Sequence, residues 1–579
     1  MKGGTNITKK RFLFSICYIF ISSIFTFKLF YPIYISEEII ITYGINPFDI
    51  CSKNPELWNI IKISYIFLFF TFHLIFVNFI YSKIFHRIYL LLKKNSSNTK
   101  HTSLSNNSKL LSNSELNLLI GATHLDQHIY IPESGLYQNF LITGTIGSGK
   151  TSSAMYPFTK QFLKFNYNNP DQKIGMLILD VKGNYYNQVK IYAEKYNLSD
   201  DIIVIELKSN TYYNPLHKPN LKPQVLANRL KTILLLFSEN NSESYWLDKA
   251  EEIIAECIKL CRIYNDGYVT FLELHKLITI PSYYKSKINI FRDLYISCKL
   301  SNTQIYDLNA SLDFFEKEFE TLDTRTKGIL VSEITRITNT FISDYDVKST
   351  FCPSIQKLNF SGFDEAIKYG KIVVLNMNIS EYRLLSKIVA AYLKLDFQTE
   401  VMSNLSKNTV KTTVFICDEY DKYVNKTDSE FFSMSREAKC INIISTQSYS
   451  SLKSNLKDDS QVKVITQNLI NKIWFRSDDL FTIEEAQKQI GKEDKEKTSN
   501  TISENAKKTR FNYITNTLNS EDSSISETFN TYLQNDYIYD TNFFTQHLET
   551  FTALTFLSDG NTIFKPQKLN MFPHFKDIL

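Results

Sequence analysis

The sequence predicts an α/β fold whose sheet is interrupted by an all-helical segment and preceded by two membrane-spanning helices. A glycine-rich loop follows a short apolar run at 139–143, and similar runs that end in polar residues recur up to 207 and again after 370. Between about 244 and 345, apolar residues instead recur at spacings of three and four, the period of a helix. With 579 residues the chain is too long for one hydrophobic core, so we expect several domains.

Two apolar segments dominate residues 1–94, which we interpret as a membrane anchor. Residues 12–35 and 60–81 each have the length of a helix that crosses a bilayer, about 20 residues. Lysine and arginine flank the outer ends of both segments, which contain only Lys28 and Lys62 themselves, whereas the loop between them is mainly acidic. The positive-inside rule therefore predicts a multi-pass protein of the cell membrane with both termini in the cytoplasm. A signal peptide or two buried core helices are the alternatives.

The glycine-rich loop follows a polar linker, residues 95–118, and belongs to the first part of the α/β domain, 119–243. It has the pattern G-x-x-x-x-G-K-T, from Gly144 to Thr151, between an apolar strand and a helix-like segment. Backbone N–H groups of such a loop bind phosphate, Lys150 reaches the β- and γ-phosphates, and the Thr151 hydroxyl ligates Mg²⁺. The predicted cofactors are therefore ATP and Mg²⁺. The predicted binding residues are Gly144, Thr145, Gly147, Ser148, Gly149, Lys150, Thr151 and Ser152. A Gly/Ser-rich turn that matches by chance is the alternative.

Two further strands are predicted in this first part. The apolar run from 175 to 179 ends in the polar turn that contains Asp180 and Lys182, and a third run covers 202–207. Because the carboxyl ends of parallel strands face the ligand in such sheets, Asp180 and Lys182 are expected near the nucleotide. A capped surface turn is the alternative for both residues.

The predicted helical insertion covers 244–345, and the second part of the α/β domain covers 346–565. Helical periods occur at 245–262, 271–278, 304–320 and 326–342, with no strong strand pattern between them. Strand patterns return at 370–377 and are followed by a helix at about 384–402.

In the second part, one apolar strand ends in two carboxylates, Asp418 and Glu419. After a phosphate-binding loop in the same chain, such an Asp holds Mg²⁺ and an adjacent Glu acts as general base for the attacking water. Gln447, at the end of the next strand, is a candidate sensor of the γ-phosphate, with a plain turn residue as the alternative. Arg436 precedes that strand and is either a transition-state arginine from a neighbouring subunit or part of a surface salt bridge.

The C-terminal region is expected to contain a loop, a hairpin and a tail. Residues 492–526 are polar and charged, which favours a mobile loop. Two apolar runs, 551–557 and 562–564, flank Asp559-Gly560 and predict a hairpin that closes the sheet, before a tail at 566–579.

Taken together, these motifs resemble the type IV coupling proteins, the TraG/TraD-like ATPases of conjugation and type IV secretion. The resemblance extends from the first apolar segment to about residue 565. Besides the two apolar segments, it is carried by Gly144–Thr151 with Pro157, Asp180–Gly183, Tyr245–Trp246, Leu322–Thr326, Asp418–Glu419, Ser435–Arg436, Ser445–Ser448, Lys472–Asp479 and Glu484–Gly491.

The resemblance implies a RecA-like motor domain with an inserted all-α domain, assembled as a homohexameric ring that couples ATP hydrolysis to substrate transfer. Lys150, Glu419, Gln447 and Arg436 would then be the catalytic residues, and Thr151 and Asp418 would hold the metal. The implied partners are DNA, relaxase or relaxosome proteins, components of a type IV secretion channel, and the membrane. Family members often extend beyond the motor for substrate recognition, whereas this chain stops soon after it.

The function expected from these observations is a membrane-anchored, DNA-stimulated ATPase that delivers DNA to a secretion channel. DNA binding should show little sequence preference, because no helix-turn-helix or zinc-finger signature occurs, and the net charge of +5 is compatible with nucleic acid. The alternatives are a receptor ATPase for protein effectors of the same machinery, an FtsK-like DNA-segregation motor, which the helical insertion disfavours, and a non-hydrolysing scaffold, which Asp418 and Glu419 disfavour.

Overall fold

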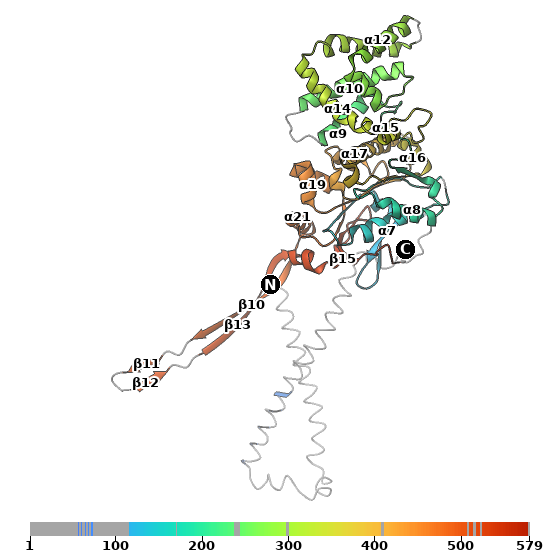
Figure 1. Ribbon diagram of the computed structural model, residues 1–579. Helices are drawn as coiled ribbons and strands as arrows, with labels where there is room; N and C mark the ends of the chain where they lie inside the picture. Colours follow the sequence, from blue (N-terminus) through green and yellow to red (C-terminus); the bar gives the residue numbers. More distant parts are fainter. Residues whose placement is uncertain are drawn as a thin grey trace. The chain divides into compact units, whose positions relative to one another are not determined.

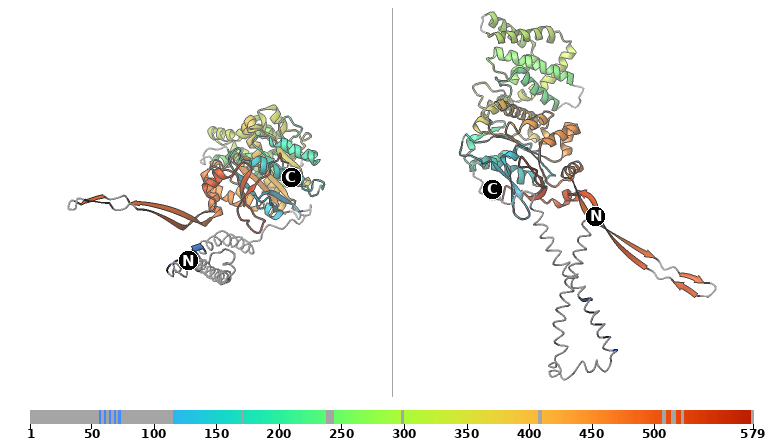
Figure 2. Two further views of the ribbon diagram at one scale, coloured as in Figure 1. Left: turned by 90° about the horizontal axis from the view of Figure 1, so that it is seen from below. Right: turned by 180° about the vertical axis from the view of Figure 1, so that it is seen from behind.

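We analysed the protein in a computed structural model, shown in Figures 1 and 2. It describes residues 56, 60, 64, 68, 71, 72, 115–169, 171–236, 244–296, 300–406, 410–505, 509–512, 517–520 and 524–576. The chain divides into two units, residues 1–111 and 112–579. Both predicted membrane spans lie almost wholly outside the described residues, and within those residues no helix is long and apolar enough to cross a bilayer.

The second unit is built on an 11-stranded sheet, which confirms the predicted α/β class. Seven neighbouring strands in the order β9-β3-β8-β7-β4-β6-β5 are parallel, and β14, β15, β1 and β2 extend the sheet antiparallel beside β9. The strands are β1 (Asn117–Ala122), β2 (His128–Pro132), β3 (Phe140–Thr143), β4 (Gly175–Leu179), β5 (Ile202–Ile205), β6 (Ile372–Leu375), β7 (Thr413–Cys417), β8 (Cys440–Thr446), β9 (Asn471–Trp474), β14 (Thr552–Phe556) and β15 (Gln567–Asn570). Strand β1 therefore begins at the end of the segment that we expected to be a linker.

Alternate residues of the central strands contribute to two different cores, one on each face of the sheet. On β4, Met176 and Ile178 pack with α7 (Tyr156–Lys164) and α8 (Tyr185–Lys195), whereas Leu177 and Leu179 pack with the helices of the other face. Because both faces are covered, these strands are continuous apolar runs in the sequence, as is usual for parallel sheets. Figures 1 and 2 show α7 and α8 on one side of the sheet and α17 (Ile379–Ser403) on the other.

A block of helices separates β5 from β6 in the sequence, although the two strands are neighbours in the sheet. The helices pack through one apolar core that continues onto the α17 face of the sheet (Figure 1). They are α9 (Pro223–Leu236), α10 (Ser244–Tyr264), α11 (Phe271–Thr279), α12 (Pro281–Ile296), α13 (Asn302–Asp313), a π-helical turn (Phe314–Phe319), α14 (Thr324–Ile342), α15 (Tyr345–Phe351) and α16 (Phe363–Tyr369). The helical region thus begins earlier and ends slightly later than the expected range 244–345, since α9 and α15 pack within it.

The expectation of a mobile loop at 492–526 is wrong. Strand β10 (Lys492–Asn505) pairs along its whole length with β13 (Ser524–Tyr537), and a second short pair joins β11 (Thr509–Asn512) to β12 (Thr517–Ser520). This two-stranded ribbon, which we call the arm, is separate from the main sheet. Its described side chains are mostly exposed, so its strands lack the buried pattern by which a strand is found in a sequence.

The C-terminal strands join the sheet, but they neither close it nor form the expected hairpin, since β1 and β2 continue the sheet beyond β15. Strand β14 pairs with β9 on one side and with β15 on the other, whereas Ile563 makes only an isolated bridge to Ser558. The segment expected to be a tail from 566 therefore begins with β15, a strand of the sheet that also pairs with β1.

Candidate nucleotide-hydrolysis site

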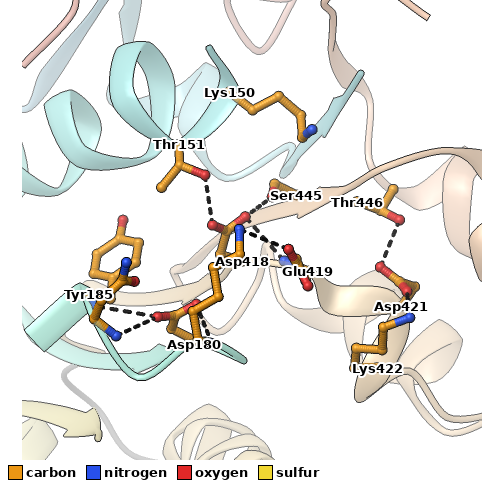
Figure 3. Close-up of polar contacts among 12 residues, drawn as sticks. Lys150, Thr151, Asp180, Tyr185, Asp418, Glu419, Asp421, Lys422, Ser445 and Thr446 are labelled. Carbon is orange, nitrogen blue, oxygen red and sulfur yellow. Dashed lines mark hydrogen bonds and ion pairs between the residues drawn. The ribbon is translucent and has the colours of Figure 1, made fainter. Parts of the chain in front are cut away.

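The predicted nucleotide residues gather where four parallel strands end. Strands β3, β8, β7 and β4 are consecutive neighbours, and the segments that follow them hold the glycine-rich loop, Gln447, Asp418 with Glu419, and Asp180 with Lys182. Parallel strands expose their carboxyl ends at one edge, so residues distant in the sequence meet there. Figure 3 shows part of this group, with Lys150 and Thr151 on one side and Asp418 and Glu419 facing them.

The loop from Gly144 to Thr151 leads from β3 into a π-helical turn, Thr151–Met155, that continues as α7. Gly149 has a φ of +100°, and a Cβ there would meet Cδ1 of Phe551 at 2.6 Å, so both the backbone conformation and the space require glycine. Within the loop, the Ser148 hydroxyl donates to the carbonyl of Thr145 at 2.8 Å, and the Thr145 N–H donates to the carbonyl of Arg476 at 2.8 Å. These hydrogen bonds hold the loop in place.

The ammonium group of Lys150 lies within this loop. It donates hydrogen bonds to the carbonyl oxygens of Gly144 and, at 3.1 Å, Thr145. Burial lowers the pKa of Lys150, and the charge of Asp418 opposes that shift. A cation surrounded by carbonyls of a phosphate-binding loop is placed to exchange them for phosphate oxygens.

Thr151 and Asp418 make direct contact across the site. The Thr151 hydroxyl donates to Oδ2 of Asp418 at 2.8 Å, while Oδ1 accepts from the Ser445 hydroxyl and from the backbone N–H of Glu419 at 3.1 Å (Figure 3). Asp418 is only 2% exposed. The hydroxyl and the carboxylate are the hard oxygen donors that Mg²⁺ prefers, so the residues present fit this ion. Within the described residues no group of three or more His, Cys, Asp or Glu side chains forms a metal cage, and Mg²⁺ usually completes its shell with water and phosphate instead.

Glu419 directly follows Asp418 and has a left-handed backbone, with φ 50° and ψ 48°. This region costs a residue other than glycine about 1 kcal/mol, and such outliers cluster at functional sites. The carboxylate Oε1 lies 2.9 Å from Nζ of Lys182, which comes from the turn after β4. The structure therefore places the predicted general base at the site and gives it a cationic neighbour.

Asp180 and Lys182 have different roles in their turn. The buried Asp180 carboxylate accepts backbone N–H groups of Lys182, Asn184 and Tyr185 at 3.1–3.2 Å, so it caps the start of α8. Burial raises the pKa of Asp180, and these hydrogen bonds oppose the rise. The alternative of a capped turn thus describes Asp180, whereas Lys182 reaches across to Glu419.

Gln447 and Arg436 lie at opposite ends of β8. The carbonyl of Gln447 accepts the N–H of Gly144 at 3.2 Å, so this residue borders the glycine-rich loop. Arg436 precedes β8, and its side chain is exposed. It therefore lies at the far edge of the sheet, away from the Lys150 of its own chain.

Two features of the site were missed by the sequence reasoning. The Ser445 hydroxyl holds Asp418, although a role in the site was predicted only for Gln447 at that strand end. The C-terminal segment also contacts the loop: the N–H of Phe551 donates to the Ser148 carbonyl at 3.2 Å, and that of His574 donates to the Ser152 carbonyl at 2.8 Å. These are contacts between distant parts of the chain, and no local pattern indicates them.

A buried polar network supports the segment that follows Glu419. Asp428 accepts Nζ of Lys394 at 2.6 Å, the side-chain N–H of Gln398 at 2.9 Å, the N–H of Asn425 at 2.9 Å and the hydroxyl of Tyr420. The side chains of Lys394 and Asp428 are both 0% exposed. Because every oxygen of Asp428 is engaged, the network fixes Tyr420 and thereby the turn that carries Glu419.

The chain is similar to known proteins in part of its sequence and in its fold. Residues 412–530 match the TraG-D_C family model, described as the TraM recognition site of TraD and TraG. Among solved structures, the chain is similar to the unbound monoclinic form of the bacterial conjugative coupling protein TrwBdeltaN70, with 12% identity, a TM-score of 0.50, and coverage of 78% of this chain and 88% of that one. It is also similar to the plasmid coupling protein TrwB in complex with ADP and Mg²⁺, with 12% identity, a TM-score of 0.48, and coverage of 76% and 87%. No match was found among curated proteins.

The family match covers the strand that ends in Asp418 and Glu419, β8, and most of the arm. The similarity to TrwBdeltaN70 extends over most of both chains and shows that they share a fold. The chain thus carries a region, 412–530, that matches the family model of TraD and TraG, and it shares the fold of TrwBdeltaN70.

Proposed function

We propose that this protein is a membrane-anchored ATPase that forms a homohexameric ring and couples ATP hydrolysis to the delivery of DNA to a type IV secretion channel. One observation carries the hydrolytic part: the Thr151 hydroxyl lies 2.8 Å from Asp418, with Glu419 as the next residue. Thr151 and Asp418 would hold Mg²⁺, and the ion would neutralise charge that develops on the phosphates.

The chain's own residues supply the remaining functions of the site. Backbone N–H groups from Gly144 to Ser152 bind phosphate, and Lys150 adds a positive charge at the β- and γ-phosphates. Glu419 accepts a proton from the attacking water. Gln447 borders the loop through its backbone carbonyl, and its side-chain amide is the proposed sensor of the γ-phosphate.

The substrate and the partners are proposed on the family match. A TraG/TraD-like protein whose matched region is described as a TraM recognition site is expected to meet relaxosome proteins at the DNA. The proposed anchor is the pair of apolar segments at 12–35 and 60–81, with both termini in the cytoplasm.

The test is ATP hydrolysis by the full-length protein in detergent, with and without DNA. Lys150→Ala should abolish turnover, and Glu419→Gln should leave only a residual rate, because loss of a general base alone costs roughly 10²–10⁴-fold. Glu430→Gln, an exposed carboxylate on α18 (Asp428–Met434), is the matched control and should hydrolyse normally. Near-normal turnover by Glu419→Gln would show that the base is assigned wrongly. If DNA neither binds at low salt nor stimulates hydrolysis, the proposed delivery of DNA is wrong, and the alternative function, a receptor for protein substrates, is favoured.

A further inference from the structure

We propose that Lys182 is the positioning residue of Glu419: its ammonium group holds one carboxylate oxygen of the general base and leaves the other free to accept the proton of the attacking water. The proposal rests on the function proposed above. It assigns to Lys182 a role that the glycine-rich loop and Asp418 do not fill.

The contact is a single, direct one. Nζ of Lys182 lies 2.9 Å from Oε1 of Glu419, and among the described residues this is the side-chain partner that the structure gives to Glu419. Oε2 is not engaged in this pair. Catalytic bases are commonly oriented by a third group in this manner, so that one atom is fixed and the other reacts.

Lys182 extends from a turn that is held rigid on several sides. Asp180 accepts the N–H of Lys182 at 3.1 Å, and the Val181 carbonyl accepts the N–H of Ile379 at 3.0 Å. Gly183 has a φ of +69°, and a Cβ there would meet the backbone nitrogen of Asn378 at 3.0 Å. The turn is therefore tied both to β4 and to the segment after β6, which fixes the origin of the Lys182 side chain.

Glu419 is fixed from the other side by its own backbone. Strands β4 and β7 pair up to Leu179 and Cys417, so the two segments that follow them are neighbours at the same edge. The left-handed conformation of Glu419 and the hydrogen bond from its N–H to Asp418 set where its side chain leaves the chain. The ion pair then holds the carboxylate itself. The Glu419 side chain is only 17% exposed, whereas the Lys182 side chain that reaches it is 55% exposed.

The charges around the pair keep Lys182 protonated. Partial burial lowers the pKa of Lys182, but the hydrogen bond to Glu419 and the charges of Glu419, Asp418 and Asp180 outweigh it and raise the pKa. The ammonium group therefore remains a donor at neutral pH, and the pair persists under the conditions of an ATPase assay.

The experiment compares Lys182→Met and Lys182→Arg with wild type in the full-length protein. Lys182→Met should lower kcat about tenfold, a part of the roughly 10²–10⁴-fold contribution of a general base, while KM for ATP stays unchanged. Lys182→Arg should recover most of the loss, because a guanidinium also donates to a carboxylate. The matched control is Lys488→Met: Lys488 is 57% exposed and lies 2.9 Å from Glu485, on α21 (Leu480–Ile490) outside the site.

A double-mutant cycle separates positioning from a general structural effect. If Lys182 acts through Glu419, adding Lys182→Met to Glu419→Gln should cause no further loss of residual turnover. A tenfold loss in both backgrounds would overturn the proposal, as would an unchanged or raised kcat for Lys182→Met alone. A fluorescent ATP analogue should bind wild type and Lys182→Met equally well, and a selective loss of ATP over ADP affinity would instead place Lys182 on the γ-phosphate.

Failure of this inference can be told apart from failure of the proposed function. If wild type hydrolyses ATP, Glu419→Gln does not, and Lys182→Met is normal, only the role of Lys182 is wrong. If wild type shows no turnover of ATP, or if Glu419→Gln turns over ATP as fast as wild type, the ATPase assignment itself is wrong.

Discussion

Arg436 is predicted to complete the nucleotide site of a neighbouring subunit, because it lies at the edge of the sheet away from its own site. It precedes β8, whereas Gln447, beyond the other end of β8, contacts the glycine-rich loop. The seven residues of β8 rise about 3.3 Å each, so roughly 20 Å separates the two edges. Its exposed side chain is free of the protein core and faces solvent in the single chain.

The perturbation is a mixture of two inactive chains, Lys150→Ala and Arg436→Ala. Each alone should lose activity, the second by roughly 10³–10⁵-fold if the arginine acts on the transition state. In a ring with head-to-tail contacts, a site uses Lys150 of one chain and Arg436 of the next. Random assembly of equal amounts pairs an intact Lys150 with an intact Arg436 in about a quarter of the sites, so about a quarter of wild-type activity should return.

The assay is steady-state ATP hydrolysis after the two chains are mixed and allowed to exchange. A mixture of Arg436→Ala with a chain carrying both substitutions is the control, because it contains no site with both residues intact. Absence of rescue in rings shown to contain both chains would refute the reasoning. Rescue in the control mixture would do so too.

Three further predictions concern stability, topology and DNA. Lys394→Met leaves the buried Asp428 without its cation, so unfolding should become easier by about 3–5 kcal/mol, measured as a lower urea midpoint, while Lys488→Met should leave the midpoint unchanged. Reporter fusions should read external at Asn54 and cytoplasmic at Ser105; an external signal at Ser105 would mean that one predicted span does not cross. DNA affinity should fall with salt with a slope of about −0.7 to −0.9 per phosphate neutralised, and scrambling the DNA sequence should change it by less than about 1–3 kcal/mol. Affinity that is insensitive to salt would contradict phosphate-based binding.

The parts of the site that the sequence predicts are motifs whose residues lie close together along the chain. The glycine-rich loop and the pair Asp418–Glu419 each follow a continuous apolar strand, and parallel strands covered on both faces are easily found by that pattern. The meeting of these strands at one edge then follows from the general rule for such sheets, and the contact between Thr151 and Asp418 is in agreement with it.

The parts that sequence reasoning missed depend on distant contacts or on unburied strands. The arm, β10 with β13, is polar and exposed on its described residues, so its composition indicates a loop while its backbone pairing makes a ribbon. The choice of β15 rather than 562–564 as the partner of β14 is likewise decided by pairing with β1 across the sheet. Asp180 follows a strand as the sequence predicts, but its capping of α8 could be told from a ligand role only with the surrounding backbone in place.

The hydrogen bonds from Phe551 and His574 to the glycine-rich loop have a consequence for how the protein is made. The His574–Ser152 contact joins residues 422 positions apart, so the loop emerges from the ribosome long before the segment that supports it. A nascent or prematurely terminated chain that lacks residues 551–574 would carry the phosphate-binding motif without this support. Such fragments should therefore be inactive, and turnover of ATP would begin only once synthesis of this segment is complete.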